Sequence, residues 1–234
     1  MNNQDMRAPL IDELLQKLEQ CYNLKSVALD LGERRLNLVK VENIDDLLDR
    51  VTDENEIPFW AELWPASIGL AKFIFQNPSL IQGKKVLELG AGVGLAGIAA
   101  KLCGAFVTQS DFLEAAFDFI RVNCIQNQAS VGDLLLADWR RFPPVPEKYD
   151  LLIGADILYE KTLHQDLLRI FSRVIKPEGS IWLADPGRDY GKQFIWMMEA
   201  EGFRNEPVQM PVFYEEKTST IDIYKLIPPR PRNK

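Results

Sequence analysis

The sequence contains little that could form a disulfide or bind a metal. Its 234 residues include three cysteines, Cys21, Cys103 and Cys124, which are far apart and form no C-x-x-C pair. An odd number of dispersed cysteines excludes a disulfide framework and indicates a reducing compartment. The single histidine, His164, lies in a helix-like stretch, where a lone histidine is more often structural or solvated than catalytic. We therefore expect no metal site.

Long apolar runs and an excess of basic charge are missing as well. No stretch of about 18 consecutive apolar residues occurs, so we expect no membrane-spanning segment. The first residues lack a basic start followed by an apolar run, so we expect no secretory signal. The net charge of −7 disfavours binding along nucleic-acid phosphates, although it is compatible with a local basic patch. These absences predict a cytoplasmic protein without membrane or nucleic-acid partners.

The residues that are present indicate one core with an accessory segment. The chain is 47% hydrophobic and 26% charged, and its length suffices for one sizeable core. Residues 1–56 predict an accessory region, with a helix near residues 10–18 and a β-hairpin near residues 27–41. Residues 57–228 are expected to form the main domain, and residues 229–234, PRPRNK, a flexible tail.

Strand and helix patterns alternate regularly from about residue 83. KKVLELG precedes the helical LAGIAAKLCG, and AFVTQSD precedes the helical LEAAFDFIRVNCIQN. Near the end, VQMPVFY and STIDIYKLI are separated only by a short polar turn, which predicts an antiparallel hairpin at a sheet edge. The pattern predicts a doubly wound α/β fold with a mostly parallel seven-stranded sheet and an antiparallel edge strand.

The segment VLELGAGVGLAG supports two interpretations. Gly92, Gly94 and Gly97 fit G-x-G-x-x-G, a pattern typical of dinucleotide sites. Gly90, Gly92 and Gly94, with Glu88 before them, fit E-x-G-x-G-x-G, which is typical of S-adenosylmethionine sites. In a dinucleotide site, Glu88 would be a carboxylate buried in a strand with a large desolvation cost and no role. In a methyltransferase it supports the glycine loop by hydrogen bonds or holds water near the methionine moiety, so we favour S-adenosylmethionine.

Carboxylates follow several of the predicted strands. Asp111, Asp138, Asp156 and Asp185 each end a strand pattern. Ligands of open α/β sheets bind beyond the carboxyl ends of the strands, although an aspartate there can equally begin a loop or cap the next helix. Asp111 stands about twenty residues after the glycine loop, where it could accept hydrogen bonds from the ribose of either cofactor.

Five stretches together carry a family resemblance. LWPASIGLAKFI, VLELGAGVGLAGIAA, TQSD, ADW and GADILYE resemble the seven-β-strand lysine methyltransferases of the family-16 group over about residues 57–190. The hallmark of that group, D-x-x-Y after the fourth strand, matches Asp156 and Tyr159. The resemblance implies a class I methyltransferase fold, S-adenosylmethionine as cofactor and a protein lysine as acceptor. The form PFWAELWP is most similar to members that act on metabolic proteins such as the electron-transfer flavoprotein β-subunit.

The resemblance also implies roles for individual residues. Asp156 and Tyr159 would be catalytic and face the substrate amine, with a loop carboxylate and a packed aromatic as the structural alternatives. Contacts to the cofactor are implied for Trp64, Gly90, Gly92, Asp111, Trp139 and Ala155. The glycine pattern and the strand ends add Glu88, Gly94 and Asp138 to this set. The N-P-P-Y motif of amide and adenine-amine methylation is absent, which argues against those acceptors.

Methyl transfer to lysine sets a requirement for the site. The displacement needs a neutral amine, but lysine has a pKa near 10.4, so only about one in a thousand is neutral at pH 7.4. That deficit corresponds to about 4 kcal/mol. Because a carboxylate raises the pKa of a neighbouring amine, Asp156 is expected to capture and orient the ammonium. Tyr159 could add a cation–π contact or align the amine through its hydroxyl.

Three other functions are compatible with the sequence. A small-molecule N- or O-methyltransferase would have a closed pocket, whereas a protein methyltransferase would have an open trough. A non-catalytic cofactor-binding or chaperone-associated module would bind the cofactor without turnover. An NAD-dependent oxidoreductase would use the dinucleotide interpretation of the glycine loop.

Overall fold

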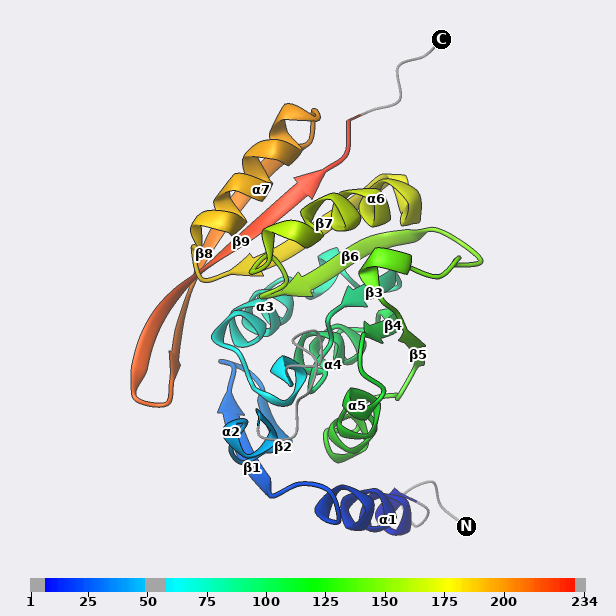
Figure 1. The fold of residues 1–234 in the computed structure, drawn as a ribbon, viewed down its shortest axis with the longest axis vertical. Helices are drawn as coiled ribbons and strands as arrows, with labels where there is room; N and C mark the ends of the chain where they lie inside the picture. The colour runs from blue at the N-terminus through cyan, green and yellow to red at the C-terminus, as the bar shows by residue number, and fades with distance from the viewer. Residues whose placement is uncertain (1–6, 49–57, 230–234) are drawn as a thin grey trace.

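The computed structural model describes residues 7–48 and 58–229 (Figure 1). The N-terminal helix and hairpin are present as predicted, and a short helix follows them. These first elements are α1 (Arg7–Glu19), β1 (Leu24–Asp30), β2 (Arg35–Val41) and α2 (Asp45–Leu48).

One mixed seven-stranded sheet forms the centre of the molecule. Its strands are β3 (Lys85–Leu89), β4 (Phe106–Asp111), β5 (Asp133–Leu136), β6 (Tyr149–Ala155), β7 (Ile175–Asp185), β8 (Arg204–Tyr214) and β9 (Lys217–Ile227). They lie in the order β5-β4-β3-β6-β7-β9-β8, and β5 to β7 pair in parallel. The predicted mostly parallel, doubly wound α/β fold is therefore confirmed.

The late hairpin differs from the prediction in one detail of its order. It lies at the sheet edge as expected, but the antiparallel strand β9 lies one place in, between β7 and β8. The edge strand β8 consequently runs parallel to β7. The inner place goes to β9 because it buries more apolar side chains, among them Ile221, Ile223 and Leu226.

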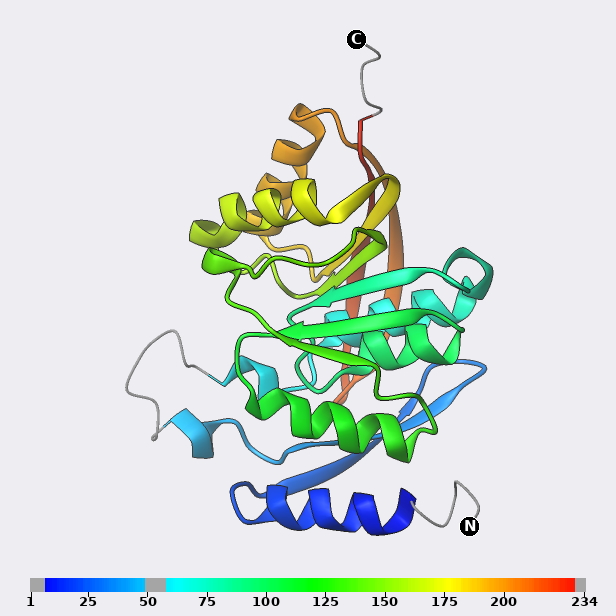
Figure 2. The same ribbon diagram turned by 90° about the vertical axis from the view of Figure 1, so that its right-hand side faces the viewer.

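Helices cover both faces of the sheet (Figure 2). The helices are α3 (Pro65–Gln76), α4 (Leu95–Leu102), α5 (Ala115–Gln126), α6 (His164–Val174) and α7 (Asp189–Ala200). Strand residues alternate between the two cores, since Val86 packs with α3, α4 and α5 whereas Leu87 and Leu89 pack with α6 and α7. His164 is buried beneath Phe194, with its Nε2 3.2 Å from the Leu158 carbonyl, which supports the structural interpretation of this histidine.

The N-terminal hairpin is attached to α5 by the buried side chain of Asn123 and by that of Asn127, which exchanges two hydrogen bonds with the main chain of Asn37. Asn123 Oδ1 accepts from the Val39 amide at 2.7 Å, and its Nδ2 donates to the carbonyls of Val39 and Val93 at 3.0 and 2.9 Å. Val93 belongs to the glycine loop after β3, so Asn123 connects the hairpin to that loop. Among the described residues, no helix is long and apolar enough to cross a membrane.

Candidate active site

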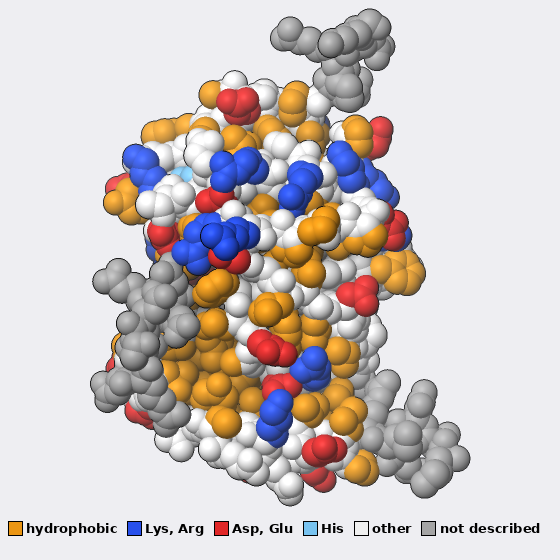
Figure 3. Space-filling model, turned by 45° about the vertical axis from the view of Figure 1, so that its right-hand side comes forward, with side chains coloured by type: hydrophobic (Ala, Val, Ile, Leu, Met, Phe, Trp, Pro, Cys, Tyr) orange, Lys and Arg blue, Asp and Glu red, His pale blue; other side chains and the backbone are white. Residues whose placement is uncertain are grey.

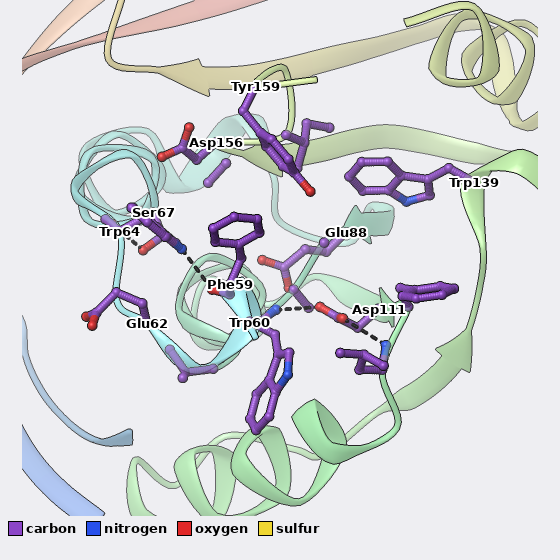
Figure 4. Close-up of a pocket in the computed structure, with 18 of the residues that line it drawn as sticks. Phe59, Trp60, Glu62, Trp64, Ser67, Glu88, Asp111, Trp139, Asp156 and Tyr159 are labelled. Carbon is purple, nitrogen blue, oxygen red and sulfur yellow. Dashed lines mark hydrogen bonds between the residues drawn. The ribbon is translucent and has the colours of Figure 1, made fainter. Parts of the chain in front are cut away.

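A cavity of about 410 Å³ lies beyond the carboxyl ends of β3, β4 and β6 (Figure 4). All the predicted site residues except Gly94 line it: Trp64, Glu88, Gly90, Gly92, Asp111, Asp138, Trp139, Ala155, Asp156 and Tyr159. Gly94 instead begins α4 with a φ of +91°, and a Cβ there would come 3.0 Å from Ile120 Cγ1. In this structure Gly94 therefore shapes the turn from behind the cavity wall, and its contact with a cofactor stays a prediction.

The turn after β3 requires glycine at two positions. Gly90 and Gly92 have φ values of +64° and +52°, in the left-handed region that other residues rarely adopt. A Cβ on Gly92 would lie 3.1 Å from the Trp60 carbonyl oxygen, and one on Gly90 would lie 3.3 Å from the Trp139 ring. The glycines therefore let the backbone turn sharply while the aromatic residues close in around the cavity.

Glu88 caps the helix that follows this turn. The side chain is only 3% exposed, and its Oε1 accepts from the amide of Gly97, in the first turn of α4, at 3.1 Å. Burial raises the pKa of Glu88 to about 7, although its hydrogen bonds oppose the rise. The predicted hydrogen-bonding role of Glu88 is thus seen in the structure. A carboxylate already at the positive end of α4 leaves this helix poorly suited to a pyrophosphate.

Two residues that the sequence analysis missed, Gln109 and Lys101, form a chain of hydrogen bonds that ends at Glu88. Gln109 Nε2 donates to Glu88 Oε2 at 2.6 Å, and Lys101 Nζ donates to Gln109 Oε1 at 2.5 Å. The ammonium of Lys101 is buried and also contacts the Val131 carbonyl. A lysine on the otherwise apolar stretch LAGIAAKL is the one signal that could have revealed this chain of hydrogen bonds.

The aspartates at the strand ends have different partners. Asp111 Oδ2 accepts from the Gly92 amide at 2.9 Å and Oδ1 from the Leu113 amide at 3.2 Å. Burial raises the pKa of Asp111, and each oxygen keeps a lone pair for a ligand. Asp138 lines the cavity but also accepts from the Arg140 amide at 2.9 Å, so it caps the following turn. The capping alternative therefore holds for Asp138, while Asp111 fixes the glycine loop.

An aromatic rim, formed by Phe59, Trp64 and Tyr159, stands at the mouth of the cavity. Phe59 packs against Tyr159 with ring centroids 5.5 Å apart, and Trp64 Nε1 donates to the Phe59 carbonyl at 2.9 Å. Figure 4 shows the hydroxyl end of Tyr159 pointing into the cavity between Phe59 and Trp139. Phe59 and Tyr159 remain 40% and 39% exposed, so the mouth opens to solvent. Figure 3 shows a hollow on the molecular surface in which hydrophobic side chains gather.

Asp156 has a partner that the sequence analysis did not anticipate. The residue has a φ of +59°, and its amide donates to the Ala184 carbonyl at 2.8 Å, which fixes the backbone. Its buried carboxylate forms an ion pair with Arg188 from the loop between β7 and α7, with 3.2 Å between Nη2 and Oδ2. Asp156 was expected to capture and orient a substrate ammonium, but in this structure the guanidinium of Arg188 contacts its carboxylate.

The charged residues that line the cavity are mainly acidic. Among the described lining residues, six carry a carboxyl group, against one cationic side chain, that of Arg140: Glu62, Glu88, Asp111, Asp138, Asp156 and Glu160. Glu62 is paired with the buried Lys40 at 2.6 Å. Such a lining attracts cations and repels phosphate groups, which favours a sulfonium or an ammonium over a dinucleotide. Among the described residues, no group of three or more histidines, cysteines or carboxylates could hold a metal ion.

Comparison with known proteins agrees with this geometry. A model of the lysine methyltransferase family matches residues 46–201, which is more than half of the chain. The chain belongs to this lysine methyltransferase family. This match confirms the resemblance drawn from the D-x-x-Y hallmark and the glycine loop. The chain's sheet order and parallel pairing give it a Rossmann-like fold.

Three curated relatives illustrate the range of this family. The chain is 32% identical over 140 residues to the human electron transfer flavoprotein beta subunit lysine methyltransferase, which covers 56% of this chain and 50% of the relative. It is 36% identical over 131 residues to mouse EEF1A lysine methyltransferase 3, covering 55% and 56%. A histone-arginine methyltransferase of Xenopus laevis is 28% identical over 165 residues, covering 65% and 69%. The chain spans about half the length of the first two relatives.

Solved structures share the fold at low identity. The tRNA (uracil-54, C5)-methyltransferase of Pyrococcus abyssi, solved with S-adenosyl-L-homocysteine, has a TM-score of 0.59 at 18% identity, covering 86% of this chain and 44% of that one. Precorrin-6y C5,15-methyltransferase of Geobacter metallireducens has a TM-score of 0.54 at 17% identity, covering 68% and 87%. Their substrates are unrelated, so these likenesses show the fold alone.

Proposed function

We propose that this protein is an S-adenosylmethionine-dependent protein-lysine N-methyltransferase. The observation that carries the proposal is an acidic cavity with two parts. One part is the glycine turn capped by Glu88, and the other is the pair Asp156 and Tyr159 at a solvent-open aromatic rim. The first part suits a positively charged donor without phosphates, and the second suits an incoming amine.

The residues of the glycine loop and its neighbours fit the cofactor. When bound, S-adenosylmethionine supplies a methyl group on a positive sulfonium, which an amine displaces while the carbon–sulfur bond breaks and its electron pair stays on sulfur. Gly90 and Gly92 leave the backbone bare of side chains, and the free lone pairs of Asp111 can accept from ribose hydroxyls. Trp139 offers a ring for adenine stacking, and the carboxylates of the lining favour the positive charge.

The substrate side would act by placing the amine. Burial raises the pKa of Tyr159, so its hydroxyl stays protonated at neutral pH and can donate to or align the acceptor. The rings of Phe59 and Tyr159 pack against each other at the mouth and present faces over which an ammonium binds favourably. Phe59 and Tyr159 would thus guide a lysine side chain from solvent toward the methyl donor.

An open mouth supports a protein rather than a small molecule as the acceptor. Two of the rim aromatics, Phe59 and Tyr159, are more than a third exposed, as a trough for a protruding side chain requires. The human and mouse relatives are named for lysines of electron transfer flavoprotein and EEF1A, and both of those targets are proteins. The acidic net charge supports a partner other than nucleic acid, and the few, widely spaced cysteines support a cytoplasmic location. Membranes are likewise not expected as partners.

A labelling experiment tests the proposal. The protein is incubated with tritiated S-adenosylmethionine and three acceptors in parallel: purified electron transfer flavoprotein β-subunit, purified EEF1A, and a heat-treated lysate of the source organism. We expect tritium on lysine Nζ after acid hydrolysis. Label on arginine or on small molecules only, or no label at all, would overturn the proposal. Calorimetry should show binding of S-adenosylmethionine but not of NAD.

One variant separates substrate handling from cofactor binding. Asp156→Ala is expected to abolish the labelling while changing the affinity for S-adenosylmethionine by less than about threefold, because Asp156 lies on the amine side of the cavity. Glu178→Ala, at an exposed carboxylate far from the cavity, is the matched control and should label normally. Normal labelling by the Asp156 variant would show that its assigned role is wrong.

A further inference from the structure

The ion pair between Asp156 and Arg188 changes the electrostatics of the amine site. Arg188 contacts both oxygens of the Asp156 carboxylate, through Nη1 and through Nη2. The Asp156 side chain is buried, whereas that of Arg188 is 37% exposed. A carboxylate has about four lone-pair positions, so two remain for hydrogen bonds from a substrate.

The position of Arg188 is fixed by the strand before it. The main-chain amides of Gly187 and Arg188 both donate to Asp185 Oδ1 at 2.7 Å, which holds the loop at the end of β7. Asp185 is fully buried, and its Oδ2 lies 4.0 Å from Arg188 Nη1. The short stretch Asp-Pro-Gly-Arg therefore presents a guanidinium to Asp156 from a neighbouring strand.

A lone carboxylate would be a poor partner for an amine that must lose its proton. It stabilises the ammonium form and raises the pKa of the amine, typically by about one to three units, so fewer acceptor molecules would be reactive at neutral pH. A guanidinium in direct contact with the carboxylate cancels most of that effect. The carboxylate can then still accept a hydrogen bond from the amine and orient it.

We propose that Arg188 is a positioning residue that neutralises Asp156, so that this carboxylate orients the acceptor amine without holding it in the protonated form. The inference rests on the proposed lysine methylation. In the wild-type site the amine meets a neutral ion pair rather than a net negative charge. The proton then leaves to water before the nitrogen attacks, and the ion pair itself neither gains nor loses a proton.

The charged and titratable groups around the pair come from several elements. Tyr159 and Glu160 follow β6, Asp185 ends β7, Lys192 lies on α7 and Asp222 lies on β9. Asp185 is influenced by both Asp222 and Lys192, which oppose each other in sign. None of these groups makes the direct contact with Asp156 that Arg188 makes, so the prediction concerns Arg188 itself.

The test compares how the rate of lysine methylation depends on pH. Wild type, Arg188→Gln, Arg188→Lys and Asp156→Asn are assayed with the heat-treated lysate as acceptor, saturating tritiated S-adenosylmethionine, and methyl-lysine counted after hydrolysis. For Arg188→Gln the rising limb of the pH–rate profile should move to higher pH by about one unit or more. The rate should fall roughly tenfold or more at pH 7 and recover toward pH 10. Arg188→Lys keeps the charge, so its limb should stay within about half a unit of wild type.

Asp156→Asn gives a prediction of opposite sign. It leaves the guanidinium without a carboxylate beside the amine, so the limb should move to lower pH, although the plateau is reduced. Arg169→Gln, at an exposed arginine on α6, is the matched control and should leave the profile unchanged. Circular dichroism and calorimetric affinity for S-adenosylmethionine verify that each variant is folded.

Four results would contradict the inference. Equal loss at every pH in Arg188→Gln would indicate a structural role only, and an unmoved limb would show that Asp156 is not neutralised by Arg188. Limbs moving in the same direction in both charge variants would also refute it. Label that appears on an atom other than lysine Nζ in wild type would overturn the proposed function together with this inference. This failure differs from the others because wild type alone shows it, without any variant.

Discussion

Replacing Glu88 by glutamine should remove a pH-dependent loss of stability. The pKa of this buried carboxyl is raised to about 7 from an ordinary value of 4.5, so the folded state binds more protons than the unfolded state between these pH values. Wild type therefore loses stability as pH rises through this window. The loss is absent below the unfolded pKa and complete above the folded one. A difference of about two and a half units corresponds to about 3 kcal/mol.

The variant also carries a penalty that does not depend on pH. Glu88 accepts from both Gly97 and Gln109, whereas a glutamine presents one acceptor and one donor, so one of these hydrogen bonds must be lost. Only the change with pH is therefore diagnostic. The free energies of unfolding of wild type and Glu88→Gln are measured in urea by circular dichroism at pH 5, 6, 7 and 8.

From pH 5 to pH 8, the unfolding free energy of wild type should fall by about 2 to 3 kcal/mol relative to that of Glu88→Gln. Glu178→Gln, at an exposed carboxylate, serves as the control and should track wild type across the series. A difference for Glu88→Gln that stays constant within about 0.5 kcal/mol would refute the reasoning, because it would show that Glu88 ionises alike in the folded and unfolded chains.

Two further substitutions test the hydrogen bonds below the glycine loop. In Gly97→Ala the new methyl would lie 2.3 Å from Glu88 Oε2, so we expect a loss of about 2 kcal/mol in urea unfolding after the gain in helix propensity is subtracted. Unchanged stability would show that the carboxylate moves aside freely. In Lys101→Met the buried acceptors lose their donor, which should cost about 1 to 3 kcal/mol. Because Lys101 lowers the pKa of Glu88, the same pH series should show the loss of stability extending to higher pH, and an unmoved midpoint would contradict this coupling.

Local pattern was enough to predict the fold and the wall of the cavity. The alternation of strands and helices, with a glycine turn after the first strand of the sheet, fixes where strand ends converge. Glu88 discriminated between cofactors because a carboxylate inside a strand needs a compensating partner, and the structure supplies the Gly97 amide. The order of β8 and β9 could not be read in this way, because both strands mix apolar and polar residues and only their relative burial decides which lies inside.

The missed residues depend on contacts between distant parts of the chain. Arg188 lies 32 residues from Asp156, and nothing local in Asp-Pro-Gly-Arg indicates that its guanidinium reaches the end of another strand. Gln109 and Lys101 are likewise brought to Glu88 by the pairing of β3 with β4 and the packing of α4. Gly94 fitted the glycine pattern, but the left-handed turn directs it toward Ile120 rather than toward the cavity.

The side chain of Asn123 couples the stability of the N-terminal hairpin to that of the glycine turn. It satisfies both main-chain groups of Val39 and, from the same amide, the carbonyl of Val93 in the turn after β3. Peeling β2 away would expose a buried amide and loosen that turn in one event. A shortened chain that kept only the sheet and its helices would lose these hydrogen bonds, and we expect its glycine turn to be less stable.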